Sequence, residues 1–216
     1  MSEAKIRVAL VDDQPLFSAG LKMILRSQPD LDLVGEATDG EQAVALASDV
    51  GPDVMLMDIR MPVMDGITAT RRITDGPGRT KVIVLTTIQH DEAVVRAIQA
   101  GAGGFLTKDA TPEFLLAAIR TVHSGHAVMA PSATNELLRD YTTPSAADSS
   151  VLEPLSARER DVFMLAAKGL ANGEIAASLV LSDATVKTHI GSILSKLTLK
   201  NRIQLVAFAY QNRLLG

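Results

Sequence analysis

Residues 53–62, Asp53-Val54-Met55-Leu56-Met57-Asp58-Ile59-Arg60-Met61-Pro62, combine a short apolar run with an aspartate and a proline. The short run of Val, Met and Leu is typical of a parallel strand that is covered on both faces. Pro62 ends the extended segment, because proline has no N–H group to donate to a sheet. Asp58 therefore stands at the carboxyl end of a buried strand, where open α/β sheets place their ligand crevice.

The same alternation of strand and helix runs through the first 124 residues. Pro15 and the pair Thr111-Pro112 are typical of a first helical turn. This order predicts an α/β domain, a (βα)5 doubly wound parallel sheet with helices on both faces. Short apolar segments predict the five strands, and residues at helical spacing follow each of them; the strands are expected at 6–11, 31–36, 53–58, 81–85 and 103–107.

Polar side chains follow four of these strands at corresponding positions. A parallel sheet brings all its carboxyl ends to one edge, so the sequence predicts a single polar site there. One aspartate after a strand is usually a helix cap, but five such polar residues are hard to explain as caps. They are Asp12, Asp13, Asp58, Thr86 and Lys108.

These residue types indicate phosphoryl chemistry. Three clustered carboxylates repel one another and need a cation, and oxygen ligands that leave room for water suit Mg²⁺. Asp58, beside such an ion and Lys108, is able to attack a phosphoryl group and form an aspartyl phosphate. The cations would neutralise charge on the transferring oxygens, and the Thr86 hydroxyl would hydrogen-bond the bound phosphoryl group.

Four motifs carry a resemblance to a known family. Residues 11–13 (VDD), 57–66 (MDIRMPVMDG), 84–87 (VLTT) and 103–110 (GGFLTKDA) resemble the receiver domain of bacterial response regulators in order, spacing and context. The resemblance implies that Asp58 accepts phosphate from a sensor histidine kinase. It also implies that Mg²⁺ is bound by Asp12, Asp13, Asp58 and the backbone carbonyl of Arg60.

The same resemblance implies a switch. Thr86 is expected to move toward the phosphoryl group, and Phe105 is expected to turn inward with it. Phe105 stands where tyrosine is common in the family, and an ordinary core aromatic is the alternative interpretation. Arg60 stands where receivers vary, so its side chain either reaches the mouth of the site and affects phosphate lifetime or lies in solvent.

The composition of the chain changes after residue 124. Residues 125–154 contain three prolines and the small polar run TTPSAADSS at 142–150, which is typical of a flexible linker. One short helix is expected within it, at 132–141. The expected domains are therefore a receiver at 1–124, a linker at 125–154 and a second domain at 155–216.

The second domain is predicted to be a small all-α domain of four helices. Ser156 and Glu159 form a capping box at the start of the first helix, and Asn172 is expected to cap the second. Two short helices joined by a tight turn, the later one polar on one face, are the pattern of a helix-turn-helix. Helices are expected from Ser156 to about residue 169 and at 173–179, 184–197 and 202–215.

The polar face of the third helix carries the candidate DNA contacts. Hydroxyl, ammonium and imidazole groups on this face suit phosphates and base edges. His189 is disfavoured as a metal ligand, because neither a carboxylate nor a second histidine stands at ligand spacing from it. The candidates are Thr185, Lys187, Thr188, His189, Ser192 and Lys196.

A second resemblance covers residues 155–197. They closely resemble the LuxR-type DNA-binding domain of the NarL/FixJ response regulators, most specifically at residues 174–176 (EIA) and 185–189 (TVKTH). The resemblance implies that the helix through Lys187 enters the major groove and that the last helix forms a two-fold dimer contact. Gly191 replaces a residue that is often basic in the family, so base specificity does not transfer.

Composition and charge agree with a two-domain regulator. The chain of 216 residues is 47% hydrophobic and has no cysteine, no apolar run of membrane-spanning length and no visible signal peptide, so a cytoplasmic location and no membrane partner are expected. From Ser156 onward, eight Lys and Arg stand against four Asp and Glu, so this segment is net +4 and the remainder is −8. This asymmetry indicates different partners, a cation for the acidic domain and nucleic acid for the basic one. A net charge of +4 is also ordinary for a small domain.

The sequence therefore predicts a two-component transcription regulator and not an enzyme. Phosphorylation of Asp58 would shift a two-state equilibrium, and a homodimer would then read a pseudo-palindromic promoter site. One alternative is an α/β phosphatase, but Arg60 stands where such enzymes carry a second acid. Another is a regulator that binds DNA without phosphorylation, against which the complete set of polar residues argues.

Overall fold

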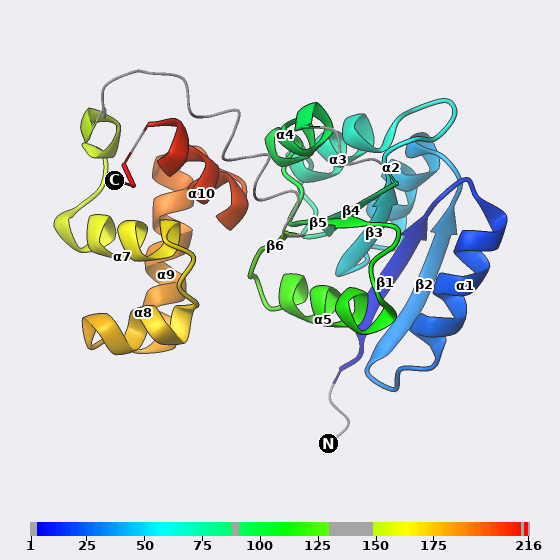
Figure 1. Ribbon diagram of the computed structural model, residues 1–216, viewed down its shortest axis with the longest axis horizontal. Coiled ribbons are helices and arrows are strands. Elements are labelled where there is room, and N and C mark those ends of the chain that lie inside the picture. The colour runs from blue at the N-terminus through cyan, green and yellow to red at the C-terminus, as the bar shows by residue number, and fades with distance from the viewer. Residues whose placement is uncertain (1–3, 88–90, 130–148, 213, 216) are drawn as a thin grey trace. The chain divides into compact units, whose positions relative to one another are not determined.

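The computed structural model describes residues 4–87, 91–129, 149–212 and 214–215 (Figure 1). The chain divides into two compact units, Met1–Thr134 and Asn135–Gly216. Each unit has its own apolar core, as expected of a domain that folds by itself. Among the described residues, every helix is too short or too polar to span a membrane.

The first unit is built around a parallel sheet. The strand order is β2-β1-β3-β4-β5-β6, and every neighbouring pair is parallel. All residues of β3 are buried, because this strand lies between two others and both of its faces are covered. The strands span Ile6–Val11 (β1), Leu31–Ala37 (β2), Val54–Asp58 (β3), Lys81–Thr86 (β4), Gly104–Thr107 (β5) and Val128–Met129 (β6).

Helices cover both faces of this sheet. Leu25 of α1 and Ile119 of α5 share one apolar cluster with Leu56 of β3. α1 and α5 lie on one face and α2, α3 and α4 on the other (Figure 1), which confirms the predicted doubly wound fold. The helices are α1 Pro15–Arg26, α2 Gly40–Asp49, α3 Gly66–Asp75, α4 Asp91–Ala100 and α5 Pro112–His123.

β6 was not predicted from the sequence. Its residues Val128 and Met129 pair with Gly104 and Phe105 of β5, within the segment expected to be linker. An edge strand offers free backbone groups, and a passing extended segment satisfies them without any sequence pattern of its own. The expected helix at 132–141 lies outside the described residues.

The second unit is a helical bundle. Its core includes Phe163 and Phe208, whose rings pack edge to face with centroids 6.2 Å apart. Leu152, from the expected linker, is buried in the same core. The described helices are a short 3-10 helix η1 Ser149–Leu152, followed by α7 Ala157–Ala167, α8 Asn172–Leu179, α9 Asp183–Lys196 and α10 Arg202–Gln211.

The caps of α7 and α8 differ in how well the sequence predicted them. The predicted capping box is present, since Ser156 N donates to Glu159 Oε2 at 2.8 Å and Glu159 N donates to Ser156 Oγ at 3.3 Å. The predicted cap of α8 is wrong, because Ala171 is the N-cap and the Asn172 side chain accepts from Arg202 Nη1 at 2.7 Å instead. A buried arginine competes for the amide oxygen that the local pattern assigned to the helix end.

Val180 forms the turn between α8 and α9. Its φ of 55° is left-handed, a conformation that a β-branched residue rarely adopts. The residue is also 92% exposed. The tight turn that the helix-turn-helix pattern predicts is therefore made at some cost in backbone strain.

Candidate functional site

The predicted polar residues of the first unit meet at the carboxyl edge of the sheet. Asp58 is the last residue of β3, and it pairs with Leu85, which directly precedes Thr86 at the end of β4. Asp12 directly follows β1, and Lys108 directly follows β5. The backbone N–H of Lys108 donates to the Thr86 carbonyl at 2.7 Å. These ends are neighbours because β1, β3, β4 and β5 are consecutive in the sheet.

The Lys108 ammonium contacts two carboxylates at this edge. Its Nζ lies 2.6 Å from Asp12 Oδ2 and 2.6 Å from Asp58 Oδ2, and all three side chains are buried. The same Nζ lies 4.6 Å from the ring centroid of Phe17 of α1, a contact that the sequence did not predict. One ammonium shared by two carboxylates leaves the buried cluster with excess negative charge.

Asp58 is poorly compensated for its burial. Burial raises the pKa of its carboxyl group, the Asp12 charge adds to the rise, and the hydrogen bond and charge of Lys108 oppose it. A backbone N–H, that of Arg60, donates to Asp58 Oδ1, but at 3.3 Å the bond is long. Such a carboxylate keeps acceptor capacity for an incoming group.

Asp12 has a similar deficit. Its Oδ1 accepts from the N–H of Gln14 at 2.8 Å. Its buried Oδ2 lies 2.6 Å from the Lys108 ammonium as an ion pair and accepts no hydrogen bond from the described residues. This buried carboxylate oxygen therefore keeps capacity to bind a cation.

Asp12, Asp13 and Asp58 form a cluster that fits a divalent cation. One oxygen from each carboxylate lies within 4.8 Å of the others. Asp13 is exposed and the other two are buried, so the cluster has a side open to water. An all-oxygen donor set with access for water suits Mg²⁺.

Gly66 holds the loop after β3 against Asp58. Its N–H donates to the Ile59 carbonyl at 2.9 Å, and a Cβ added to it would overlap the carbonyl oxygen of Asp58. Any side chain here would push α3 away from the end of β3. Asp65, just before this glycine, caps α3, so the turn and the helix start are built from adjacent residues.

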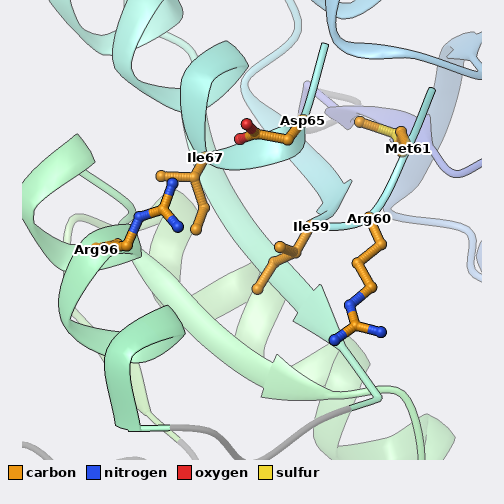
Figure 2. Close-up of a pocket in the computed structure, with 6 residues that line it drawn as sticks. All are labelled: Ile59, Arg60, Met61, Asp65, Ile67 and Arg96. Atoms are coloured by element: carbon orange, nitrogen blue, oxygen red, sulfur yellow. The ribbon is translucent and has the colours of Figure 1, made fainter. Parts of the chain in front are cut away.

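An open cavity of about 460 Å³ adjoins this loop (Figure 2). Figure 2 shows Arg60 entering it from the loop and Arg96 from α4, with Ile59 between them. The Arg60 side chain is exposed to solvent where it lines this cavity. The cavity is lined by Ile59, Arg60, Met61, Asp65, Ile67 and Arg96.

The two expected switch residues are both buried. Thr86 ends β4, and Phe105 of β5 pairs with Val84 on one side and Met129 on the other. Phe105 therefore already belongs to the core in this state. Its role as a switch stays a prediction.

The predicted DNA contacts on α9 fall into two groups. Thr185, Lys187 and Thr188 are exposed, and His189 is half-buried. By contrast, Glu159 of α7 engages the remaining two, since Ser192 Oγ lies 2.5 Å from its Oε1 and Lys196 Nζ lies 2.7 Å from its Oε2. Ser192 and Lys196 thus fasten α9 to the rest of the domain in this state.

Glu159 is a residue whose second role the sequence did not reveal. The hydrogen bonds from Lys196 and Ser192, followed by that from the Ser156 N–H, hold the pKa of its carboxyl group well below the usual range. The capping box fully explains a glutamate at this position of α7. Only the packing of α9 against α7 shows that the same carboxylate joins two helices.

Comparison with known proteins adds to this geometry. Residues 8–120 match the response regulator receiver domain, and residues 153–209 match the luxR family of bacterial regulatory proteins. The chain is 41% identical to the transcriptional regulatory protein YxjL of Bacillus subtilis (strain 168) over 98% of each chain, and 34% identical to the nitrate/nitrite response regulator protein NarL of Escherichia coli (strain K12) over 96% of each. The crystal structure of the response regulator ChrA of a heme-sensing two-component system matches at a TM-score of 0.54 and 39% identity, covering 99% of this chain and all of that one.

Proposed function

The chain belongs to the two-component response regulators in which a receiver domain is joined to a LuxR-type DNA-binding domain, and we propose that Asp58 is the residue whose phosphorylation controls it. The family consists of transcription regulators and is not a known class of enzyme. The observation that carries the proposal is the Lys108 ammonium, 2.6 Å from both Asp58 and Asp12 at the open edge of the sheet. A cation at that distance supports attack by the carboxylate on a phosphoryl group.

Asp58 is proposed to act as the nucleophile. One carboxylate oxygen forms a bond to phosphorus, the P–N bond of a phosphohistidine on the sensor kinase breaks, and the histidine nitrogen keeps that electron pair and takes up a proton. Lys108, which now contacts the carboxylate, would donate to an oxygen of the transferred group. The Thr86 hydroxyl is proposed to donate to the same group.

Mg²⁺ is the cation proposed for the carboxylate cluster. Asp12, Asp13, Asp58 and the carbonyl of Arg60 would hold it, and the ion would neutralise charge on the phosphoryl oxygens. The buried Asp12 Oδ2, which has Lys108 as an ion-pair partner but accepts no hydrogen bond from the described residues, supports this assignment. The Arg60 N–H already donates to Asp58, so the backbone of this residue borders the site.

The output is proposed to be promoter binding by a homodimer. Phosphorylation would be transmitted through Thr86 and Phe105, and α9 would then read a pseudo-palindromic site in the major groove. Ser192 and Lys196 are already engaged by Glu159. The primary contacts are therefore proposed to be Thr185, Lys187, Thr188 and His189.

The test is labelling of the full-length protein with acetyl phosphate and Mg²⁺. We expect Asp58→Asn to abolish the covalent phosphoryl group in intact-mass spectra, while Asp32→Asn, an exposed aspartate on β2, keeps it. Retention of a single label in the Asp58 variant would place the acceptor elsewhere. Release of many phosphates per protein molecule would favour the phosphatase alternative.

A further inference from the structure

The two lysines of α9 each face a carboxylate, but the two pairs differ in kind. Lys196 contacts the buried Glu159 of α7, which ties two helices together. Lys187 Nζ lies 3.0 Å from Asp183 Oδ2 within α9 itself, and the two side chains are 56% and 50% exposed. The second pair therefore lies on the surface that would meet DNA, and packing does not account for it.

We infer that Asp183 determines DNA specificity, because it keeps the Lys187 ammonium from the phosphates of unrelated duplexes and forms with it a donor–acceptor pair suited to G·C base pairs. The inference rests on the proposed binding of DNA by α9. Beyond that proposal, Asp183 would weaken binding to DNA of any sequence, and a G·C base pair would remove this unfavourable effect.

Phosphates attract Lys187 whatever the base sequence. A lysine that neutralises a phosphate releases a counterion, and this term is shared by all duplexes. To make such a contact, Lys187 must leave Asp183, and the carboxylate then faces a polyanion without its partner. The exposed pair is easily broken in water, but beside phosphates its separation leaves like charges together. Asp183 thus weakens the part of binding that carries no sequence information.

A G·C base pair presents the opposite situation. In the major groove, guanine O6 and N7 accept hydrogen bonds, and the cytosine N4 amine donates one. Lys187 would donate to the guanine edge, and Asp183 would accept from the cytosine amine. Both groups then have a partner, and the Asp183 carboxylate does not face the phosphates unpaired. Because residues four apart are neighbours on one helix face, the two groups would address the same base-pair step.

A purely structural role for Asp183 makes a different prediction. An acid in the first turn of a helix is favourable because of the helix dipole. Ser182 already caps α9, since its Oγ accepts the N–H of Thr185 at 3.1 Å. If Asp183 acted only on the helix, its removal would change stability and would leave discrimination between duplexes unaltered.

The experiment compares Asp183→Asn with Asp161→Asn in the full-length, phosphorylated protein. Asp161 of α7 is the matched control, because it is similarly exposed and faces Arg158 at 3.7 Å, so both variants remove one negative charge. Affinity is measured between 50 and 200 mM salt for two duplexes. One is recovered by in vitro selection with the wild-type protein, and the other has the same bases in shuffled order.

We expect Asp183→Asn to bind the shuffled duplex more tightly and with a salt slope steeper by about 0.9 per recognition helix, the value for one added phosphate contact. The ratio of selected to shuffled affinity should fall by about tenfold, the size of one base-edge contact. Asp161→Asn should change neither quantity, and in a Lys187→Met background Asp183→Asn should no longer steepen the slope.

Equal effects of the two aspartate variants on both duplexes would overturn the inference, because net charge would then explain them. A steeper slope that persists without Lys187 would also overturn it. If the wild-type protein selects no duplex and binds none, the proposed DNA binding itself fails. The two failures are therefore distinguishable.

Discussion

Asp58 and Glu159 are both buried carboxylates with a lysine ammonium at nearly the same distance, yet their pKa values are shifted in opposite directions. Asp58 is 2% exposed with Lys108 at 2.6 Å, and Glu159 is 5% exposed with Lys196 at 2.7 Å. Burial raises the pKa of Asp58, whereas hydrogen bonds lower that of Glu159. The presence of a lysine therefore does not by itself decide the state of a buried acid.

The remaining partners make the difference. Glu159 also accepts from the Ser192 hydroxyl and the Ser156 N–H, so its charge is satisfied on all sides. Asp58 shares its lysine with Asp12 and has one further, long hydrogen bond from Arg60. A satisfied carboxylate stabilises a fold, while an undercompensated one at an open edge is suited to chemistry.

The largest expected effect comes from removing each lysine in the same way. Lys108→Met should lower the free energy of opening of β1 and β3 by about 3–5 kcal/mol, because two buried carboxylates lose their counter-charge. Lys196→Met should cost about 1 kcal/mol or less, since this side chain is 41% exposed and the other partners of Glu159 remain. Hydrogen exchange with mass spectrometry, in the presence of a chelator, measures the free energy of opening in both units of the full chain. Equal losses of stability in the two variants would contradict the difference between Asp58 and Glu159.

A smaller effect is expected when Glu159 loses its charge. Glu159→Gln should destabilise the packing of α7 with α9 by about 2 kcal/mol at neutral pH, because charge-assisted hydrogen bonds are weakened. Glu174→Gln is the control, since Glu174 is exposed and accepts the Ala171 N–H at 2.6 Å at the start of α8.

The same variant carries a pH signature. The pKa of Glu159 is lowered from an ordinary value of 4.5, so its contribution to stability is present above that pH and is lost as the pH falls below it. The difference between wild type and Glu159→Gln should therefore shrink on acidification. A difference that stays constant as the pH falls well below 4.5 would contradict the assignment.

The smallest expected effect has the opposite sign. Asp58→Asn should stabilise β1 and β3 by on the order of 1 kcal/mol in chelator at neutral pH, because a poorly paired buried charge is removed. Since the pKa of Asp58 is raised from 3.8, its ionised form weakens the fold above that pH, and the gain should vanish as the pH falls toward 3.8. A loss of stability in Asp58→Asn would mean that Asp58 is satisfied as Glu159 is.

The accuracy of sequence reasoning differed between kinds of feature. Local patterns predicted the strand that ends at Asp58, the capping box of Ser156 and Glu159 and the helix-turn-helix, and all of these are found in the structure. Features that join distant segments were missed, among them β6, the Phe17 ring beside Lys108 and the Arg202 side chain that holds Asn172. A contact between remote segments leaves no periodicity in either of them.

The polar residues at the strand ends and the order of the two domains follow from local sequence patterns, because side-chain alternation and helix caps are properties of neighbouring residues. The balance of each charge depends on tertiary packing. This packing placed one ammonium between Asp12 and Asp58, and it turned Ser192 and Lys196 toward Glu159. The physical reason is that the electrostatic state of a buried group depends on every atom packed around it, and most of those atoms come from other parts of the chain.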